Sequence, residues 1–134
     1  MIYLPDTNAI SAYLTGRDAS LVLRMQDSFE DIRLSSLVVA EREFGILHHA
    51  SGQRYRARFE TLLQVLPVEP FTRADAHHYA SLRSLLEKRG EGIGPLDTLI
   101  AAQALRLGAT VITHNLREFR RVPGLRVEDW QTAA

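Results

Sequence analysis

Cysteine is absent from this chain of 134 residues. A disulfide framework, a thiolate zinc site and a cysteine nucleophile are therefore excluded, and any nucleophile has to be an oxygen or a nitrogen. No segment approaches the roughly 20 apolar residues that a membrane span requires. The apolar run before Asp6 is too short for a signal-peptide core and has no basic region ahead of it, so we expect a cytoplasmic protein.

Net charge is lacking as well, because 16 basic residues balance 16 acidic ones. No whole-molecule field therefore attracts nucleic acid. Every basic residue except Lys88 is an arginine, whose planar guanidinium suits phosphate and single-stranded bases. A biased genomic base composition explains the same usage equally well.

What is present is the composition of an ordinary globular domain. Apolar residues make up 46% and charged residues 24% of the chain, and there is no repeat, low-complexity tract or linker. The length suits one core. We therefore predict a single domain over residues 1–134.

Apolar runs alternate with helical patterns along the chain. Ser35 or Ser36 can cap one helix, Thr72 and Asp75 have the spacing of a capping box, and Pro95 suits a helix's first position. The patterns predict strands at 2–4, 65–68 and 109–113 and helices at 37–49, 55–64, 73–89 and 95–107. Such alternation is typical of βαβ units. We expect an α/β fold, a three-layer α/β/α sandwich with a central parallel sheet.

Two aspartates are the strongest functional candidates. Asp6 follows the first strand, and Thr113 to Asn115 follow the last convincing one, so both ends lie on the edge where parallel sheets bind ligands. Asp97 stands in the first turn of its helix. Each aspartate alone is equally well explained as a helix cap or a dipole partner. Together they would repel each other unless a hard cation such as Mg²⁺ or Mn²⁺ is bound.

Glu41 and Glu43 lie on the helix that follows Ser36. The apolar face expected for this helix contains Leu37, Ala40, Phe44 and Leu47, and the two glutamates flank it on opposite sides. Periodicity therefore leaves open which of them points into the site.

Four groups of motifs resemble the VapC-type PIN-domain toxins of VapBC toxin–antitoxin systems, in the same order and over nearly the whole chain. They are LPDTN at 4–8; SLVVAE at 36–41 with FGI at 44–46; GIGPLD at 92–97 with IAA at 100–102; and THNLREF at 113–119, followed by VPGLR at 122–126 and DW at 129–130. Each motif alone is weak, but the four together are specific.

The resemblance implies a PIN-type sandwich with a magnesium-binding carboxylate cluster. It carries over Asp6, Glu41 and Asp97 as catalytic metal ligands, and it selects Glu41 over Glu43. Glu118 matches a fourth acidic position less securely, because His114 and Asn115 stand where many relatives carry an acid. Thr7, Asn8, Thr113 and Asn115 are candidates for orienting ligands or water, and each is equally plausible as a turn or cap residue. We expect His114 to be an ordinary loop residue.

The implied activity is a Mg²⁺- or Mn²⁺-dependent endoribonuclease that acts on structured RNA such as tRNA. The implied partners are a VapB-like antitoxin and a second copy of the chain. Two alternatives remain open: a PIN-fold module that binds DNA or RNA with little turnover, and a receiver-like magnesium-binding signalling domain. The latter needs an acidic pair after the first strand and a lysine after the last, whereas Asp6 is single and Lys88 lies on a predicted helix.

Overall fold

The computed structural model describes residues 1–131, so the last three residues of the predicted 1–134 domain lie outside the described part. Its elements are, in chain order, β1 (Tyr3–Pro5), α1 (Thr7–Thr15), α2 (Ala19–Asp27), η1 (Phe29–Asp31), β2 (Leu34–Ser35), α3 (Ser36–His48), η2 (Gly52–Tyr55), α4 (Arg56–Val65), β3 (Val68–Glu69), α5 (Arg73–Lys88), α6 (Pro95–Leu107), β4 (Thr110–Ile112), α7 (Leu116–Phe119) and β5 (Arg126–Glu128).

All the paired strands run parallel. The order β1-β4-β5 forms one sheet and β2-β3 a second, and a parallel bridge between Tyr3 and Ile32 joins them at β1. Pro5 occupies the last position of β1, where its missing N–H costs no ladder bond. The carboxyl ends of the strands therefore share one edge, as the α/β prediction requires.

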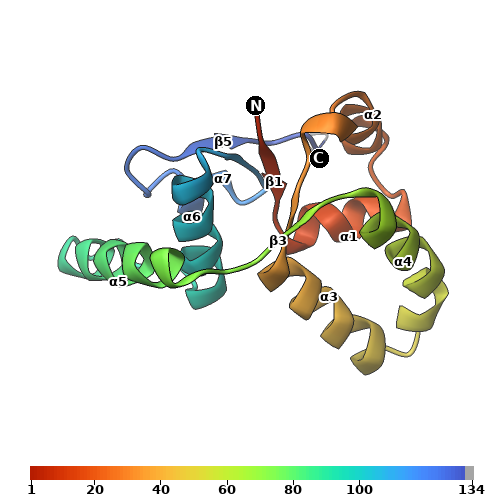
Figure 1. The fold of residues 1–134 in the computed structure, drawn as a ribbon, viewed down its shortest axis with the longest axis horizontal. Helices are drawn as coiled ribbons and strands as arrows, with labels where there is room; N and C mark the ends of the chain where they lie inside the picture. The colour runs from red at the N-terminus through yellow and green to blue at the C-terminus, as the bar shows by residue number, and fades with distance from the viewer. Residues whose placement is uncertain (132–134) are drawn as a thin grey trace.

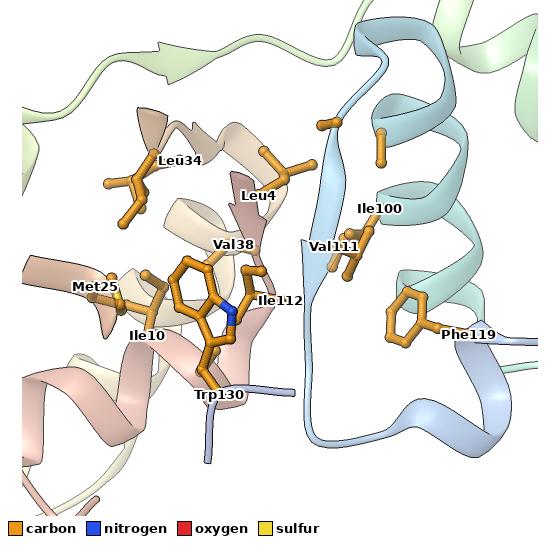
Figure 2. Packing of buried hydrophobic residues seen from close by; sticks show 14 of the residues in the cluster. Leu4, Ile10, Met25, Leu34, Val38, Ile100, Val111, Ile112, Phe119 and Trp130 are labelled. Atoms are coloured by element: carbon orange, nitrogen blue, oxygen red, sulfur yellow. The ribbon is translucent and has the colours of Figure 1, made fainter. Parts of the chain in front are cut away.

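Helices cover both faces of this central sheet, with α5 and α6 on one side of the strands and α1, α3 and α4 on the other (Figure 1). Successive side chains of β4 point toward the two helical layers in turn, because side chains alternate along a strand. Val111 points toward Ile100 of α6, whereas Ile112 lies on the side of Ile10 and Trp130 (Figure 2). The predicted three-layer α/β/α fold is thereby confirmed.

Local capping chemistry sets the helix starts. The Ser35 hydroxyl accepts from the Leu37 backbone N–H at 3.1 Å and caps α3, while the Ser36 hydroxyl accepts from the Phe71 N–H at 3.0 Å. The capping box of Thr72 and Asp75 is present in both directions. Ser35 rather than Ser36 is therefore the cap.

The predicted strand at 65–68 was wrong in its position. Val65 ends α4, and the strand consists of Val68 and Glu69 alone. The β-prone run 65–68 straddles the two elements, because Leu66 is the buried C-cap residue of α4. The strand β5 and the helix α2 were not predicted at all.

The expected apolar face of α3 was also wrong. Phe44 and Leu47 are 59% and 75% exposed, and Ala40 is exposed too. The buried residues are Val38, Gly45 and Ile46. Periodicity failed because the true face contains a glycine and, as described below, an arginine, which a hydrophobicity pattern discounts.

No helix within residues 1–131 is long and apolar enough to cross a membrane.

Gly52 is the position where the packing of η2 against α3 tolerates no side chain. A Cβ added there would lie 2.7 Å from the Ile46 Cα and would overlap the Ile46 carbonyl. We expect Gly52→Ala to lower the free energy of unfolding by about 1–3 kcal/mol, as overpacking does. Urea unfolding of both proteins measures this.

The matched control is Gly92→Ala, because the added methyl group meets nothing within 4 Å. It should shift the stability by less than about 0.5 kcal/mol. Equal effects of the two substitutions would contradict the packing argument.

Candidate functional site

Asp6 is held at the carboxyl end of β1 by its own backbone. Its N–H donates to the Ile112 carbonyl at 2.9 Å, which extends the β1–β4 ladder by one residue. Its side chain accepts from the Ala9 backbone N–H at 2.9 Å and so caps α1, and it is also hydrogen-bonded to Thr113. Asp6 therefore caps α1 and also lies at the candidate site.

The Asp6 carboxyl is 5% exposed. Burial raises its pKa, and the charge of Asp129 raises it further, while the hydrogen bonds from Thr113 and Ala9 and the nearby His114 act in the opposite direction. The net shift is upward, so this buried position disfavours the ionised form. An opposite charge placed beside Asp6 would reverse that preference.

Asp97 stands in the first turn of α6, which begins at Pro95 after Gly94. Burial, the charges of Asp6 and Glu118, and a hydrogen bond to Glu118 raise the pKa of Asp97 to about 6, against a smaller lowering effect of Asn115. The helix start alone would stabilise the carboxylate. Burial, assisted by the like charges, outweighs this effect, and the contributions of Asp6 and Glu118 to the pKa of Asp97 place the three carboxyl groups in one electrostatic neighbourhood.

The loop after β4 supplies the other side of this neighbourhood. The Thr113 hydroxyl accepts from the Asn115 backbone N–H at 2.9 Å, and the Asn115 side-chain amide donates to Glu118 at 3.0 Å. Asn115 is also hydrogen-bonded to Asp97. Asn115 thus bridges two carboxyl groups, and Thr113 ties the same loop to Asp6.

Two of the predicted orienting residues differ in their surroundings. The Thr7 hydroxyl oxygen is buried and has no hydrogen-bond partner within residues 1–131, whereas Asn8 is exposed. A buried hydroxyl without a partner is costly. Thr7, directly after Asp6, is therefore left with capacity to bind a water or another ligand.

The glutamates of α3 lie in different environments. Glu43 forms an ion pair with Arg56 at 3.1 Å, which links α3 to α4. Glu41 is exposed and is not among the largest influences on the pKa of Asp6 or Asp97. The electrostatic neighbourhood of Asp97 thus groups Asp6, Asp97 and Glu118.

His114 and Asp129 form a pair that the sequence analysis missed. The His114 Nδ1 atom lies 2.8 Å from the Asp129 carboxylate, and both charges act on Asp6. Asp129 reaches this edge because it follows β5, a strand of three residues that was not predicted. The signal available was the DW pair at 129–130, which belongs to the last of the recognised motifs.

The donor set suits a hard divalent cation. All the grouped carboxyls are oxygen donors, and the Asp97–Glu118 hydrogen bond needs a proton between two acids where a cation would neutralise both. Within residues 1–131, no group of three or more acidic or histidine side chains is placed closely enough to hold a metal ion. The chemistry of the residues therefore fits a metal, while a complete ligand set requires side chains to move.

The comparisons with known proteins agree with the geometry. A PIN-domain family model matches residues 3–125. Ribonuclease VapC2 of Rickettsia felis is 33% identical over 134 residues, covering 97% of this chain and 98% of that protein. The tRNA(fMet)-specific endonuclease VapC of Salmonella typhimurium is 30% identical over 96% of this chain and 97% of its own length.

Solved structures give the same result. In the crystal structure of VapBC2 from Rickettsia felis bound to a DNA fragment from the promoter, the matched chain aligns with a TM-score of 0.89 and 30% identity. The alignment covers 98% of this chain and 100% of that one. The chain therefore belongs to the PIN-domain family and, within it, to the VapC-type ribonuclease toxins.

Proposed function

We propose that this protein is a Mg²⁺-dependent endoribonuclease, with Mn²⁺ as a substitute, in which Asp6, Asp97, Glu118 and Glu41 form the metal-binding catalytic site. The observation that carries the proposal is the gathering of the first three carboxyls at the sheet edge, where burial together with the charges of Asp6 and Glu118 raises the pKa of Asp97 to about 6. Family membership supports the choice of reaction.

The bound cation would supply a water of lowered pKa and would neutralise charge on the phosphoryl oxygens. The protein's own residues have simpler tasks. Asp6 and Asp97 provide fixed carboxylates on helix starts, and Asn115 orients the carboxylate of Glu118 through its amide. Thr113 holds the loop beside Asp6. We expect products with a 5′-phosphate and a 3′-hydroxyl.

Glu41 enters the proposal through the family motif. Glu43 forms an ion pair with Arg56, which supports this choice. Of the two glutamates, Glu41 is the one without an ion-pair partner in the described residues. The unpaired side chain is exposed and is free to adopt another rotamer.

The substrate and partners follow from the relatives. One relative is named as specific for tRNA(fMet), and the matched structure is a VapBC complex. We infer a structured RNA such as tRNA as the substrate, in the cytoplasm, and a VapB-type antitoxin as the partner. A homodimer of the toxin is part of the same proposal.

The two alternatives make different demands. A receiver-like domain needs a lysine near its aspartates, but Lys88 ends α5 rather than following the last strand of the sheet. A module that binds nucleic acid without turnover remains distinct in one measurable respect, since it leaves RNA intact.

The first test is incubation of the protein with total RNA and with purified tRNA, in Mg²⁺ and in EDTA, followed by mapping of the cut ends. We expect cleavage in Mg²⁺, none in EDTA, and 5′-phosphate ends. Cleavage in EDTA or cyclic-phosphate ends would sink the metal mechanism, and intact RNA in Mg²⁺ would favour the binding module.

Asp97→Asn should abolish cleavage while the fold survives. The amide conserves the shape and removes one negative charge from the proposed metal site, so we expect the rate to fall by more than roughly 100-fold, the upper range for residues that only support a ligand. Single-turnover cleavage in Mg²⁺ measures the rate. A variant that cuts RNA normally would return Asp97 to the status of a helix-start residue.

The same substitution tests the pKa of Asp97 without metal. Because this pKa is raised to about 6, the folded protein binds the proton more tightly than the unfolded chain does, and ionisation lowers stability as pH rises. The loss begins near the unfolded pKa of about 4 and is complete above about 6. In EDTA, Asp97→Asn should melt like the wild type near pH 4 and higher than it near pH 7.5.

The helix-dipole interpretation forecasts the opposite sign at neutral pH. Loss of a first-turn carboxylate would then cost about 0.3–1 kcal/mol. A variant that melts lower than the wild type near neutral pH would show that repulsion does not dominate at Asp97.

Glu41→Gln should damage cleavage far more than Glu43→Gln. Only Glu41 is proposed to bind metal, whereas Glu43 contributes a partly exposed ion pair worth about 0–1 kcal/mol. Cleavage rates and thermal melts of both variants separate the roles. Equal losses of activity, or a greater loss at Glu43, would remove Glu41 from the site.

A further inference from the structure

Arg42 occupies the buried side of α3, where Val38, Gly45 and Ile46 also lie at helical spacing. One nitrogen of its guanidinium, Nη1, donates to the Ser11 hydroxyl of α1 at 2.8 Å. Its Nε–H is buried and has no hydrogen-bond partner within residues 1–131. The guanidinium packs over Gly45, where a Cβ would lie in van der Waals contact with it at 3.5 Å.

This arginine has no carboxylate partner in the part of the chain that the structure describes, because no acidic oxygen lies within 4.0 Å of it. The partly buried Arg106 shows the contrast, since it forms a bidentate pair with the buried Asp75. A partly desolvated cation without a counterion is costly. No carboxylate of the described residues therefore neutralises the charge of the Arg42 guanidinium.

The guanidinium lines a surface pocket of about 210 Å³. The polar side chains of its wall carry hydroxyl groups or basic groups and include no carboxylate: Ser11, Thr15, Arg17, Arg42, His49, Ser51 and Tyr55. Guanidinium N–H groups around a small concavity are donors of the kind that bind phosphate oxygens. The pocket is thus suited to an anion.

The pocket and the carboxylate site share the helix α1, which supplies Ser11 and Thr15 to the pocket wall and begins at Asp6. Asp6 caps this helix, the Ser11 hydroxyl donates to the Thr7 carbonyl at 3.0 Å, and the Thr15 hydroxyl donates to the Ser11 carbonyl at 3.0 Å. Ser11 lies five residues beyond Asp6, a rise of about 7 Å along the helix. A nucleic-acid strand bound at the carboxylates passes this pocket if it runs along α1.

The carboxylate cluster and the neutral net charge make such a pocket necessary. RNA phosphates are repelled by Asp6, Asp97 and Glu118, and most affinity for a nucleic-acid backbone comes from neutralised phosphates. Since the whole molecule supplies no attractive field, the positive charge has to be local. Arg42 and Arg17 supply positive charge at this pocket.

We propose that the Arg42 pocket binds a backbone phosphate of the RNA substrate. This inference rests on the proposed ribonuclease function and adds to it a subsite that is separate from the carboxylates. Arg42 binds the phosphate through its guanidinium N–H groups, Ser11 orients the guanidinium, and Arg17 and His49 line the rim.

The test measures RNA affinity in an Asp97→Asn background, so that binding is read without cleavage. Arg42→Gln should weaken tRNA binding about tenfold and lower the salt dependence of log K by about 1, as loss of one phosphate contact does. The matched control is Arg89→Gln at the exposed C-cap of α5, which removes the same charge away from the pocket. It should change neither quantity by a comparable amount.

A second measurement keeps the proposal testable if Arg42→Gln lowers stability. Titration of the wild-type protein with inorganic phosphate, followed by NMR, should give saturable shifts at the amides of Ser11, Arg42 and His49. Shifts spread over exposed arginines on other faces would overturn the pocket as a site. Arg42→Lys, which keeps the charge but loses the planar fork, should restore part of the RNA affinity.

The outcomes separate this inference from the proposed function. If the wild type cuts RNA in Mg²⁺ and Arg42→Gln binds RNA as tightly as its background, the subsite is wrong and the ribonuclease stands. If the wild type neither binds nor cuts RNA, both are overturned. If Arg42→Gln weakens only the binding of the antitoxin, the pocket belongs to the protein partner and the proposal fails.

Discussion

The pairing of β1 with β4 is the interaction on which the site depends. Because the strands are parallel, both end at the same edge, and the Asp6 N–H donates to the Ile112 carbonyl at 2.9 Å. That bond places Asp6 beside Thr113, whose loop carries Asn115 toward Asp97. Segments more than 100 residues apart in the chain are thus brought together by a backbone ladder rather than by side-chain recognition. Gathering like-charged carboxyl groups costs free energy. The fold can hold them together because the strand ladder, and not the site itself, determines their position.

Charge explains the two polar regions of the surface along α1. At its start, burial and neighbouring acids raise the pKa values of Asp6 and Asp97, which favours a cation. Where Ser11 of this helix meets α3, the Arg42 guanidinium lacks a carboxylate partner in the described residues and favours an anion. A phosphodiester bound with a divalent cation satisfies both demands.

The sequence predicted local features, such as helix starts and strands, better than it predicted which face of a helix is buried. Pro95 at a helix start, the Thr72–Asp75 capping box and the strand before Thr113 were all found, because each depends on neighbouring residues. The burial of α3 was mispredicted, since Phe44 is exposed and Arg42 faces inward. Which side of a helix is covered depends on the elements that pack on it. Asp129 was missed because β5 has too few residues to show a strand pattern.

By itself the sequence determined the family, the α/β class and the identity of the acidic candidates, because these reside in ordered motifs and local chemistry. Tertiary structure alone decided which candidates meet: Asp97 with Glu118 and Asp6, and His114 with Asp129. It also decided that Glu43 pairs with Arg56, whereas periodicity had left both glutamates equivalent. The physical reason is the distance along the chain over which each interaction acts. Caps and strand propensities act over a few residues, but the electrostatic neighbourhood of a carboxyl group depends on every element that the fold packs around it.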